Sequence, residues 1–250
     1  MKLAGRRALI SGSSTGIGRG VALAFAREGA DVVVNYPDAS QAGNAQGVVD
    51  EIRALGRRAL AIEADVANEL HVERLVDGAV SALGGLDILV NNAGIAAASP
   101  IESTPVELWD RTLAVHLRSA FLLIRRVLPL MYAQDYGKII TTASQLAYKG
   151  AGGFAHYTAA KGALISMTRS VALEIGTRNV NINCVAPGAT HTPILAGVPD
   201  DLLEGIRRAI PKGRIADVDD IVPAFVFLAS DESRHFQGQT LSPNGGDVFL

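Results

Sequence analysis

The sequence predicts an α/β protein in which helices cover both faces of one parallel sheet, a doubly wound arrangement. Three observations carry this prediction. Short β-rich runs alternate with longer segments of helical periodicity along almost the whole chain. The β-rich runs are continuously apolar, as expected for strands that are buried on both faces. A glycine-rich turn joins the first run to the first helical segment, as in a Rossmann fold.

Each element follows from its composition and its boundaries. Runs bounded by Gly, Pro, Asn or Asp are predicted to be strands, namely Arg7–Ser11, Asp31–Asn35, Ala59–Glu63, Leu86–Asn91, Lys138–Thr142 and Asn181–Ala186. Apolar residues recur at helical spacing in Ile17–Glu28, Gly47–Leu55, Leu70–Leu83, Val106–Tyr132 and Tyr157–Ile175. Because the chain contains neither an internal repeat nor a linker, residues 1–250 are predicted to form one domain.

One segment breaks this alternation near the end of the sheet. Residues 187–211 contain four prolines and a short amphipathic piece, Asp200–Ala209. A long insertion at this place is more typical of a lid or binding loop than of a surface excursion, so we expect a lid.

Composition excludes several classes of function. The 250 residues carry a net charge of −2 with no cluster of Lys and Arg, so neither nucleic acid nor an anionic membrane is an expected partner. The single cysteine, Cys184, excludes an intramolecular disulfide, and the five scattered histidines predict no metal centre. With no signal-peptide pattern and no apolar stretch of about 20 residues, a cytoplasmic location is expected.

The turn after the first predicted strand has the composition of a phosphate-binding loop. It reads Gly12-Ser13-Ser14-Thr15-Gly16-Ile17-Gly18. Glycines permit a tight turn and a close approach to a pyrophosphate, which then lies at the N-terminus of the next helix. Such a turn is weak evidence alone, but a dinucleotide site requires it at this junction.

The expected acidic residue about 20 positions further on, which would bind the adenosine ribose, is absent. Asn35 stands there, able to bind a ribose hydroxyl or to lie beside a 2′-phosphate without repelling it. No Arg or Lys occupies position 15, 36 or 37 to bind that phosphate. The choice between NAD and NADP is therefore open.

A second group of residues has the composition of a proton-transfer site. Tyr157 and Lys161 are four residues apart on a predicted helix and share one face, and Ser144 ends the fifth strand. An ammonium nearby favours the phenolate and lowers the pKa of a tyrosine from about 10. A half-buried tyrosine and a solvated lysine are the alternative for this pair taken alone.

With these motifs in order, the chain resembles the short-chain dehydrogenase/reductases from about Leu3 to its C-terminus. Four signatures carry the resemblance: Gly12–Gly18, then Asn91-Asn92-Ala93-Gly94, then Ser144 with Tyr157-Thr158-Ala159-Ala160-Lys161, then Pro187-Gly188. The closest likeness is to 3-oxoacyl-carrier-protein reductases and glucose dehydrogenases.

The resemblance implies a role for each matching position. The Gly12–Gly18 turn would hold the pyrophosphate, Asp65 and Val66 would contact the adenine, and Asn91, Ala93 and Gly94 would lie beside the adenine ribose. Pro187, Gly188 and Thr192 would line the nicotinamide carboxamide, and Lys161 would bind the nicotinamide ribose and lower the pKa of Tyr157. Tyr157 would be the general acid or base, and Ser144 would bind the substrate oxygen.

Two positions near this set allow alternatives. Family members usually carry an asparagine, which holds a water in a proton relay, where this chain has His116. The imidazole either replaces the amide as a hydrogen-bond partner or adds a catalytic group that titrates near neutral pH. Gln145 follows Ser144 and either contacts the substrate or is structural.

The sequence thus predicts an oxidoreductase that transfers a hydride between NAD or NADP and a secondary alcohol or ketone. A 3-oxoacyl thioester and a sugar or polyol are the two candidate substrates, and the apolar residues after Gly94 favour the thioester. A non-catalytic nicotinamide-sensing module or a methyltransferase would not need Ser144, Tyr157 and Lys161 together. The broadly apolar long helices and the apolar end of the tail, up to Leu250, predict a homotetramer.

Overall fold

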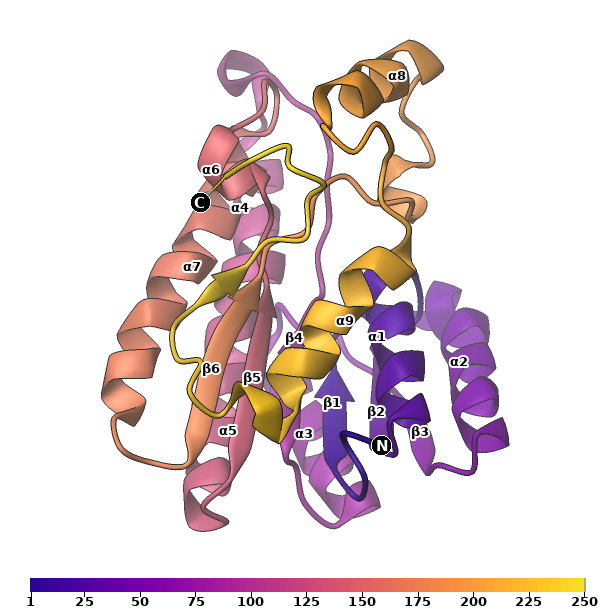
Figure 1. Cartoon of the computed structure of the whole chain (residues 1–250), viewed down its shortest axis with the longest axis vertical. Coiled ribbons are helices and arrows are strands. Elements are labelled where there is room, and N and C mark those ends of the chain that lie inside the picture. Colours follow the sequence, from indigo (N-terminus) through magenta and orange to yellow (C-terminus); the bar gives the residue numbers. More distant parts are fainter. Residues whose placement is uncertain (250) are drawn as a thin grey trace.

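The computed structural model describes residues 1–249, which form a sheet of seven parallel strands in the order β3-β2-β1-β4-β5-β6-β7 (Figure 1). The strands are β1 (Arg7–Ile10), β2 (Asp31–Tyr36), β3 (Ala59–Glu63), β4 (Ile88–Asn91), β5 (Gly137–Thr142), β6 (Val180–Val185) and β7 (Thr240–Leu241). Every neighbouring pair is parallel. The predicted single-domain Rossmann fold is confirmed.

The helices form one layer on each face of the sheet. They are α1 (Gly16–Arg27), α2 (Ala42–Ala54), α3 (Glu69–Leu83), α4 (Val106–Leu113), α5 (Ser119–Ala133), α6 (Leu146–Lys149), α7 (Ala155–Ile175), α8 (Asp200–Ala209) and α9 (Val218–Ala229), with the π-helical segment η3 (Ala114–Arg118) between α4 and α5. Short 3-10 turns are η1 (Ala39–Gln41), η2 (Ile101–Ser103), η4 (Pro193–Leu195) and η5 (Asp231–Ser233).

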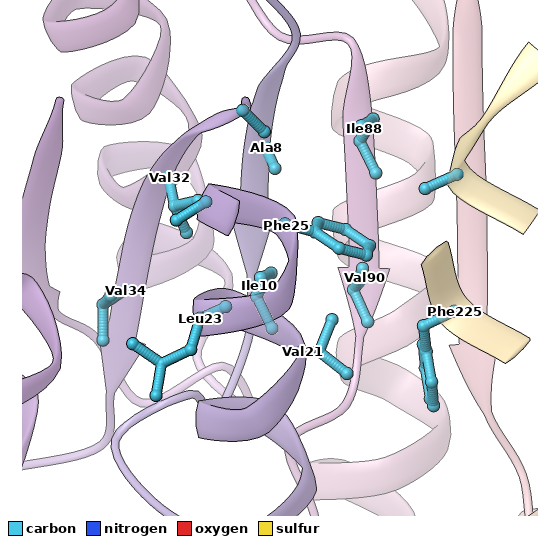
Figure 2. Packing of buried hydrophobic residues seen from close by; sticks show 14 of the residues in the cluster. Ala8, Ile10, Val21, Leu23, Phe25, Val32, Val34, Ile88, Val90 and Phe225 are labelled. Atoms are coloured by element: carbon cyan, nitrogen blue, oxygen red, sulfur yellow. The ribbon is translucent and has the colours of Figure 1, made fainter. Parts of the chain in front are cut away.

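Two apolar clusters hold these layers to the sheet. One joins α1, α2 and α9 to one face, and the other joins α3, α5 and α7 to the opposite face. Figure 2 shows Phe25 of α1 and Phe225 of α9 in the first cluster, beside Val90 of β4. All three side chains are fully buried, so the hydrophobic effect fixes the helices on the central strands.

The predicted elements are present, with three additions. All six predicted strands occur with ends within two residues, although α2 begins at Ala42 rather than Gly47. The sequence analysis missed β7, α6 and α9. Strand β7 has only two residues, and α6 is a single turn. Helix α9 is almost wholly apolar after its first turn, so it lacks the amphipathic periodicity that reveals a surface helix.

The long helix predicted over Val106–Tyr132 is interrupted. It consists of α4, the π-helical segment η3 and α5, and His116 lies at the centre of η3. A π-helical turn contains one more residue than an α-helical turn and frequently marks a functional position.

The strand order creates a single crevice at one edge of the sheet. Strand β1 pairs with β2 on one side and with β4 on the other, so the chain reverses its winding direction there. Ligands of doubly wound sheets bind at the carboxyl ends of the strands beside this switch point. The segments that follow β1, β4, β5 and β6 lie at this edge, and α8 stands above it in Figure 1.

Within the described part of the chain, we find no helix that has both the length and the apolar composition to cross a membrane.

Candidate active site

The turn after β1 brings two loops of the crevice into direct contact. Gly12 has a φ of +59°, and a Cβ atom at this position would lie 2.8 Å from the Cα of Ala93. A Cβ atom on Gly18 would lie 2.3 Å from the carbonyl oxygen of Gly12. These contacts require glycine at both positions, because any side chain would force the backbone apart.

The N-terminus of α1 has the features of an anion-binding site. Thr15 makes no side-chain capping hydrogen bond, and the first turn of α1 contains no acidic residue. The first N–H groups and the positive end of the helix dipole thus suit a pyrophosphate held by the turn, which includes Ser14 and Ile17. The Cβ of Thr192 lies 3.5 Å from where a Cβ atom on Gly16 would be, so Thr192 lies beside this turn, and its cofactor contact stays a prediction.

Asn35 braces this turn from the neighbouring strand, and the ribose or 2′-phosphate contact expected for it stays a prediction. Its Oδ1 accepts a hydrogen bond from the Gly12 N–H at 3.0 Å, and its Nδ2 donates to the Ala64 carbonyl at 3.0 Å. Weaker bonds reach the carbonyls of Tyr36 and Ile62. The side chain is 1% exposed, so its hydrogen-bonding capacity is used within the protein.

Ser11 and Asn92 are further braces that the sequence analysis left out of the site. The Asn92 Nδ2 donates to the carbonyls of Ser11 and Gly12, at 3.1 and 3.0 Å. The Ser11 Oγ accepts from the backbone N–H groups of Asn92 and Ala93. The neighbouring Asn91 turns inward and donates to the Thr141 Oγ1 at 3.2 Å. The pair Asn91-Asn92 was the sequence signal for this contact, because it lies at the end of β4, which pairs with β1.

The predicted adenine-contacting residues lie after β3. Both guanidinium Nη atoms of Arg111 bind the Asp65 carboxylate, at 2.8 and 3.2 Å. Burial alone would raise the pKa of Asp65, but Arg111 and the Ala67 N–H hold it below its usual value. Val66 is buried in the apolar cluster beneath. Arg111 is therefore a part of this region that the sequence gave no reason to include.

The structure brings Ser144, Tyr157 and Lys161 together at the ends of β5 and α7. The Ser144 Oγ accepts a hydrogen bond from the Leu146 N–H at 3.1 Å, and its hydroxyl lies close enough to Tyr157 to affect the pKa of the phenol. The Lys161 Nζ donates to the Thr142 carbonyl at 2.6 Å and lies 5.6 Å from the centre of the Tyr157 ring. This bond uses one of the three ammonium protons and leaves the others for the hydroxyl groups of a nicotinamide ribose.

His116 packs between the loop after β4 and Tyr157. Its ring meets the Tyr157 ring edge-on, with centroids 5.3 Å apart. Its Nε2 lies 2.7 Å from the Ile95 carbonyl oxygen. A Cβ atom on Gly94 would lie 2.5 Å from the His116 Cε1, so the imidazole occupies the space that a side chain at position 94 would need.

The C-terminal segment closes the site beside Ser144. The Gln145 Nε2 donates to the Asp247 carboxylate at 2.6 Å, and the Lys149 ammonium binds the same carboxylate at 2.7 Å. The Pro187 carbonyl accepts from the Gln145 N–H at 3.0 Å, and a Cβ atom on Gly188 would lie 2.7 Å from the Asn244 Cα. The substrate contact suggested for Gln145 stays a prediction.

Comparisons with known proteins agree with this geometry. A family model described as enoyl-(acyl carrier protein) reductase matches residues 12–247. The chain is 38% identical over 246 residues to (2S)-[(R)-hydroxy(phenyl)methyl]succinyl-CoA dehydrogenase subunit BbsD of Thauera aromatica, covering 98% of each chain. It is 37% identical over 241 residues to a Staphylococcus epidermidis 3-oxoacyl-[acyl-carrier-protein] reductase, FabG, covering 96% of this chain and 98% of the relative.

Among solved structures, a short-chain dehydrogenase from Burkholderia cenocepacia in complex with NADP superposes with a TM-score of 0.90. It is 36% identical, with 99% of each chain covered. The chain belongs to the short-chain dehydrogenase/reductase family. It is an NAD(P)-dependent oxidoreductase that acts on CH–OH groups.

The electrostatics of this short-chain dehydrogenase/reductase differ from the sequence-based expectation for Tyr157. Burial raises the pKa of Tyr157, and the nearby Ser144 hydroxyl only partly opposes this effect. Burial lowers the pKa of Lys161 to about 7, so at neutral pH its ammonium is only partly charged. The lowering of the Tyr157 pKa by Lys161 that the resemblance implies is therefore not seen in this structure, where burial dominates.

The titrating role considered for His116 is not supported either. Burial, together with the nearby Lys161, lowers the pKa of His116 to about 3. The ring is therefore neutral across the physiological range, which fits the alternative of a hydrogen-bond partner.

The brace formed by Asn35 leads to a prediction about cofactor binding. Asn35→Asp removes the donor to Ala64, and we expect it to lower the free energy of unfolding by about 2 kcal/mol. It should weaken NADH and NADPH binding alike, because the turn loosens without any change at a ribose. Fluorescence titration with both cofactors checks this, with the exposed Asn44→Asp as the control. A selective loss of NADPH binding would instead place Asn35 at the 2′-phosphate.

The neutral His116 predicts how stability depends on pH. Histidine in the unfolded chain has a pKa near 6.5, so as the pH falls below this value the unfolded state takes up a proton that the folded state refuses. From pH 7 to pH 5 this effect costs the wild type about 2 kcal/mol, and His116→Gln should be spared that loss. Urea unfolding at the two pH values measures it, with the exposed His235→Gln as the control. Equal acid sensitivity of wild type and His116→Gln would contradict the buried neutral ring.

Proposed function

We propose that this enzyme reduces 3-oxoacyl thioesters to 3-hydroxyacyl thioesters. The observation that carries the proposal is the apolar loop after Gly94, which His116 joins to Tyr157 by contacting both the Ile95 carbonyl and the Tyr157 ring. Residues Ala96–Ala98 are exposed and offer methyl groups but no polar side chains to a substrate. Two relatives support the same class, since one is named for a CoA thioester and the other for an acyl-carrier-protein thioester. A sugar or polyol would find few hydrogen-bond partners on this loop.

In this reaction the chain supplies a proton and positions the substrate oxygen. The Ser144 Oγ and the Tyr157 Oη both bind the 3-oxo oxygen of the substrate. NADH or NADPH, when bound, supplies the hydride to C3. As negative charge develops on the oxygen, Tyr157 transfers its phenolic proton to it. Burial raises the pKa of Tyr157, so the phenol is protonated at neutral pH and can act as the acid in the reduction.

The segment 187–211 is the proposed lid over the substrate. It leaves the sheet after β6, passes the glycine turn at Thr192 and forms α8 above the carboxyl ends of the strands (Figure 1). The exposed Ile194 and Leu202 give this segment apolar surface that an acyl chain can cover. Closure of such a segment excludes water from the reacting carbonyl.

The test of this function is the oxidation of NADPH or NADH in the presence of acetoacetyl-CoA. We expect a kcat/KM above about 10⁴ M⁻¹s⁻¹ with the preferred cofactor. Tyr157→Phe removes the proton donor and should lower kcat by 10²- to 10⁴-fold, roughly the range of general acid catalysis. Cofactor binding, measured by nicotinamide fluorescence, should persist in this variant. Turnover of sugars or polyols but not of acetoacetyl-CoA would reject the thioester as the substrate class.

A homotetramer is part of the proposal. Large apolar side chains are exposed on the long helices, among them Phe121 of α5 and Leu173 of α7, which is 84% exposed. Phe249 at the tail is 88% exposed, whereas Leu250 lies outside the described residues. Such surfaces are typically covered by neighbouring subunits. The cytoplasmic location expected from the sequence stays a prediction.

Light scattering at micromolar concentration measures the assembly directly. We expect four times the chain mass of 26.1 kDa. Leu173→Glu places a charge on the exposed α7 surface and should reduce the mass without unfolding the chain. Glu174→Gln, on the neighbouring exposed position, is the control. A monomeric mass for the wild type would contradict the tetramer.

A further inference from the structure

The loop that follows Gly94 is the apolar loop of the proposed acyl site, and it would form one wall of that site. It contains no helix or strand that could hold it in place. Residues 95–99, called here the 95–99 loop, have no helical or strand hydrogen bonds. Its middle residues, Ala96–Ala98, are exposed and provide no side-chain anchor. The position of this wall must therefore be set by the groups that bind its backbone.

Two buried histidines provide those groups. The His116 Nε2 lies 2.7 Å from the Ile95 carbonyl oxygen, and the His156 Nε2 lies 3.0 Å from the Ala97 carbonyl oxygen. The two side chains are 3% and 1% exposed. A backbone bond from the Ser99 N–H to the Gly153 carbonyl, at 2.8 Å, completes the attachment.

The His116 Nε2 contacts both polar groups of Ile95, because the Ile95 N–H donates to it at 3.1 Å and the Ile95 carbonyl oxygen lies 2.7 Å away. A neutral imidazole that donates from Nε2 carries only a lone pair on Nδ1. In residues 1–249 neither Nδ1 atom has a hydrogen-bond partner, and both are buried. A second proton would therefore be buried without an acceptor, at a considerable cost in free energy. Among the described residues, Nε2 is thus the ring nitrogen that has a hydrogen-bond partner in both histidines, and in each case that partner is the backbone of the 95–99 loop.

Both histidines also adjoin the proposed proton donor. The His116 ring packs edge-on against the Tyr157 ring, and His156 precedes Tyr157 at the start of α7. Helix α7 packs against α4 and η3, so the two rings approach the loop from different elements. One structural unit therefore contains the substrate wall and the phenol that must meet the substrate oxygen.

We propose that His116 and His156 are positioning residues that hold the 95–99 loop at a fixed distance from Tyr157 and thereby set the specificity of the acyl pocket. The assignment of an acyl substrate rests on the proposed function, whereas the loop attachment rests only on the contacts above. A wall that moves by an ångström misplaces the reacting carbonyl, and such errors cost roughly 10- to 100-fold in rate.

The experiment compares variants that keep or remove the donor. Glutamine places an amide nitrogen close to the Nε2 position, whereas leucine has no donor and asparagine is too short to reach the loop. We expect His116→Gln and His156→Gln to retain kcat/KM for acetoacetyl-CoA within about threefold. The Leu variants and His156→Asn should lose 10- to 100-fold, roughly the cost of a misplaced substrate. The Kd for NADPH should stay unchanged in all of them.

Hydrogen exchange of the peptide spanning residues 92–105 gives a readout that needs no substrate. The Leu variants and His156→Asn should speed exchange in this peptide, while the Gln variants should match the wild type. If a Leu variant fails to fold, His156→Asn still decides, because it keeps a polar side chain at that site. Unchanged exchange in a folded His156→Asn would overturn the proposal. Faster exchange without acetoacetyl-CoA turnover by the wild type would overturn only the proposed substrate.

Discussion

The contact between Gly12 and Ala93 is the constraint on which this active site depends. It brings the turn after β1 against the loop after β4, at the point where the sheet reverses its winding. Asn35 and Asn92 hold the turn from its two sides, through bonds to the N–H and to the carbonyl of Gly12. A dinucleotide site needs open backbone at this place, and these amides supply the rigidity that glycine lacks.

Burial sets the electrostatics of the catalytic groups. Tyr157, Lys161 and His116 occupy one poorly solvated region, and each shifts toward its neutral form. The raised pKa keeps the Tyr157 phenol protonated at neutral pH, and the pKa of Lys161 falls to about 7. If Lys161 binds the nicotinamide ribose, as the resemblance implies, the hydroxyl groups of a bound cofactor would favour its charged form. Reduction begins from the protonation state of Tyr157 that burial itself favours.

The sequence predicts the parts of the site that local spacing encodes. Tyr157 and Lys161 lie one helical turn apart, and the glycines directly follow a strand. Once the order of the strands is known, these two motifs are therefore expected at the same end of the sheet. The contacts of Asn35, Arg111 and Asp247 could not be predicted, because residues distant in the sequence supply their partners. Asn35 meets Gly12 from the neighbouring strand β2, and Asp247 reaches Gln145 from the far end of the chain. Helix α9 escaped prediction because a nearly uniform apolar run has no helical period.

The position of the His116 ring depends on the absence of a side chain at position 94. Its ring is longer than the asparagine usual in the family, and it reaches the Ile95 carbonyl only because position 94 has no side chain. The π-helical turn of η3 carries the ring at the buried side of the helix, against Tyr157. Gly94, η3 and His116 are therefore interdependent, since a side chain at position 94 would displace the ring. A neutral, buried imidazole is a rigid hydrogen-bond partner, and rigidity is what a loop without secondary structure needs beside a reacting carbonyl.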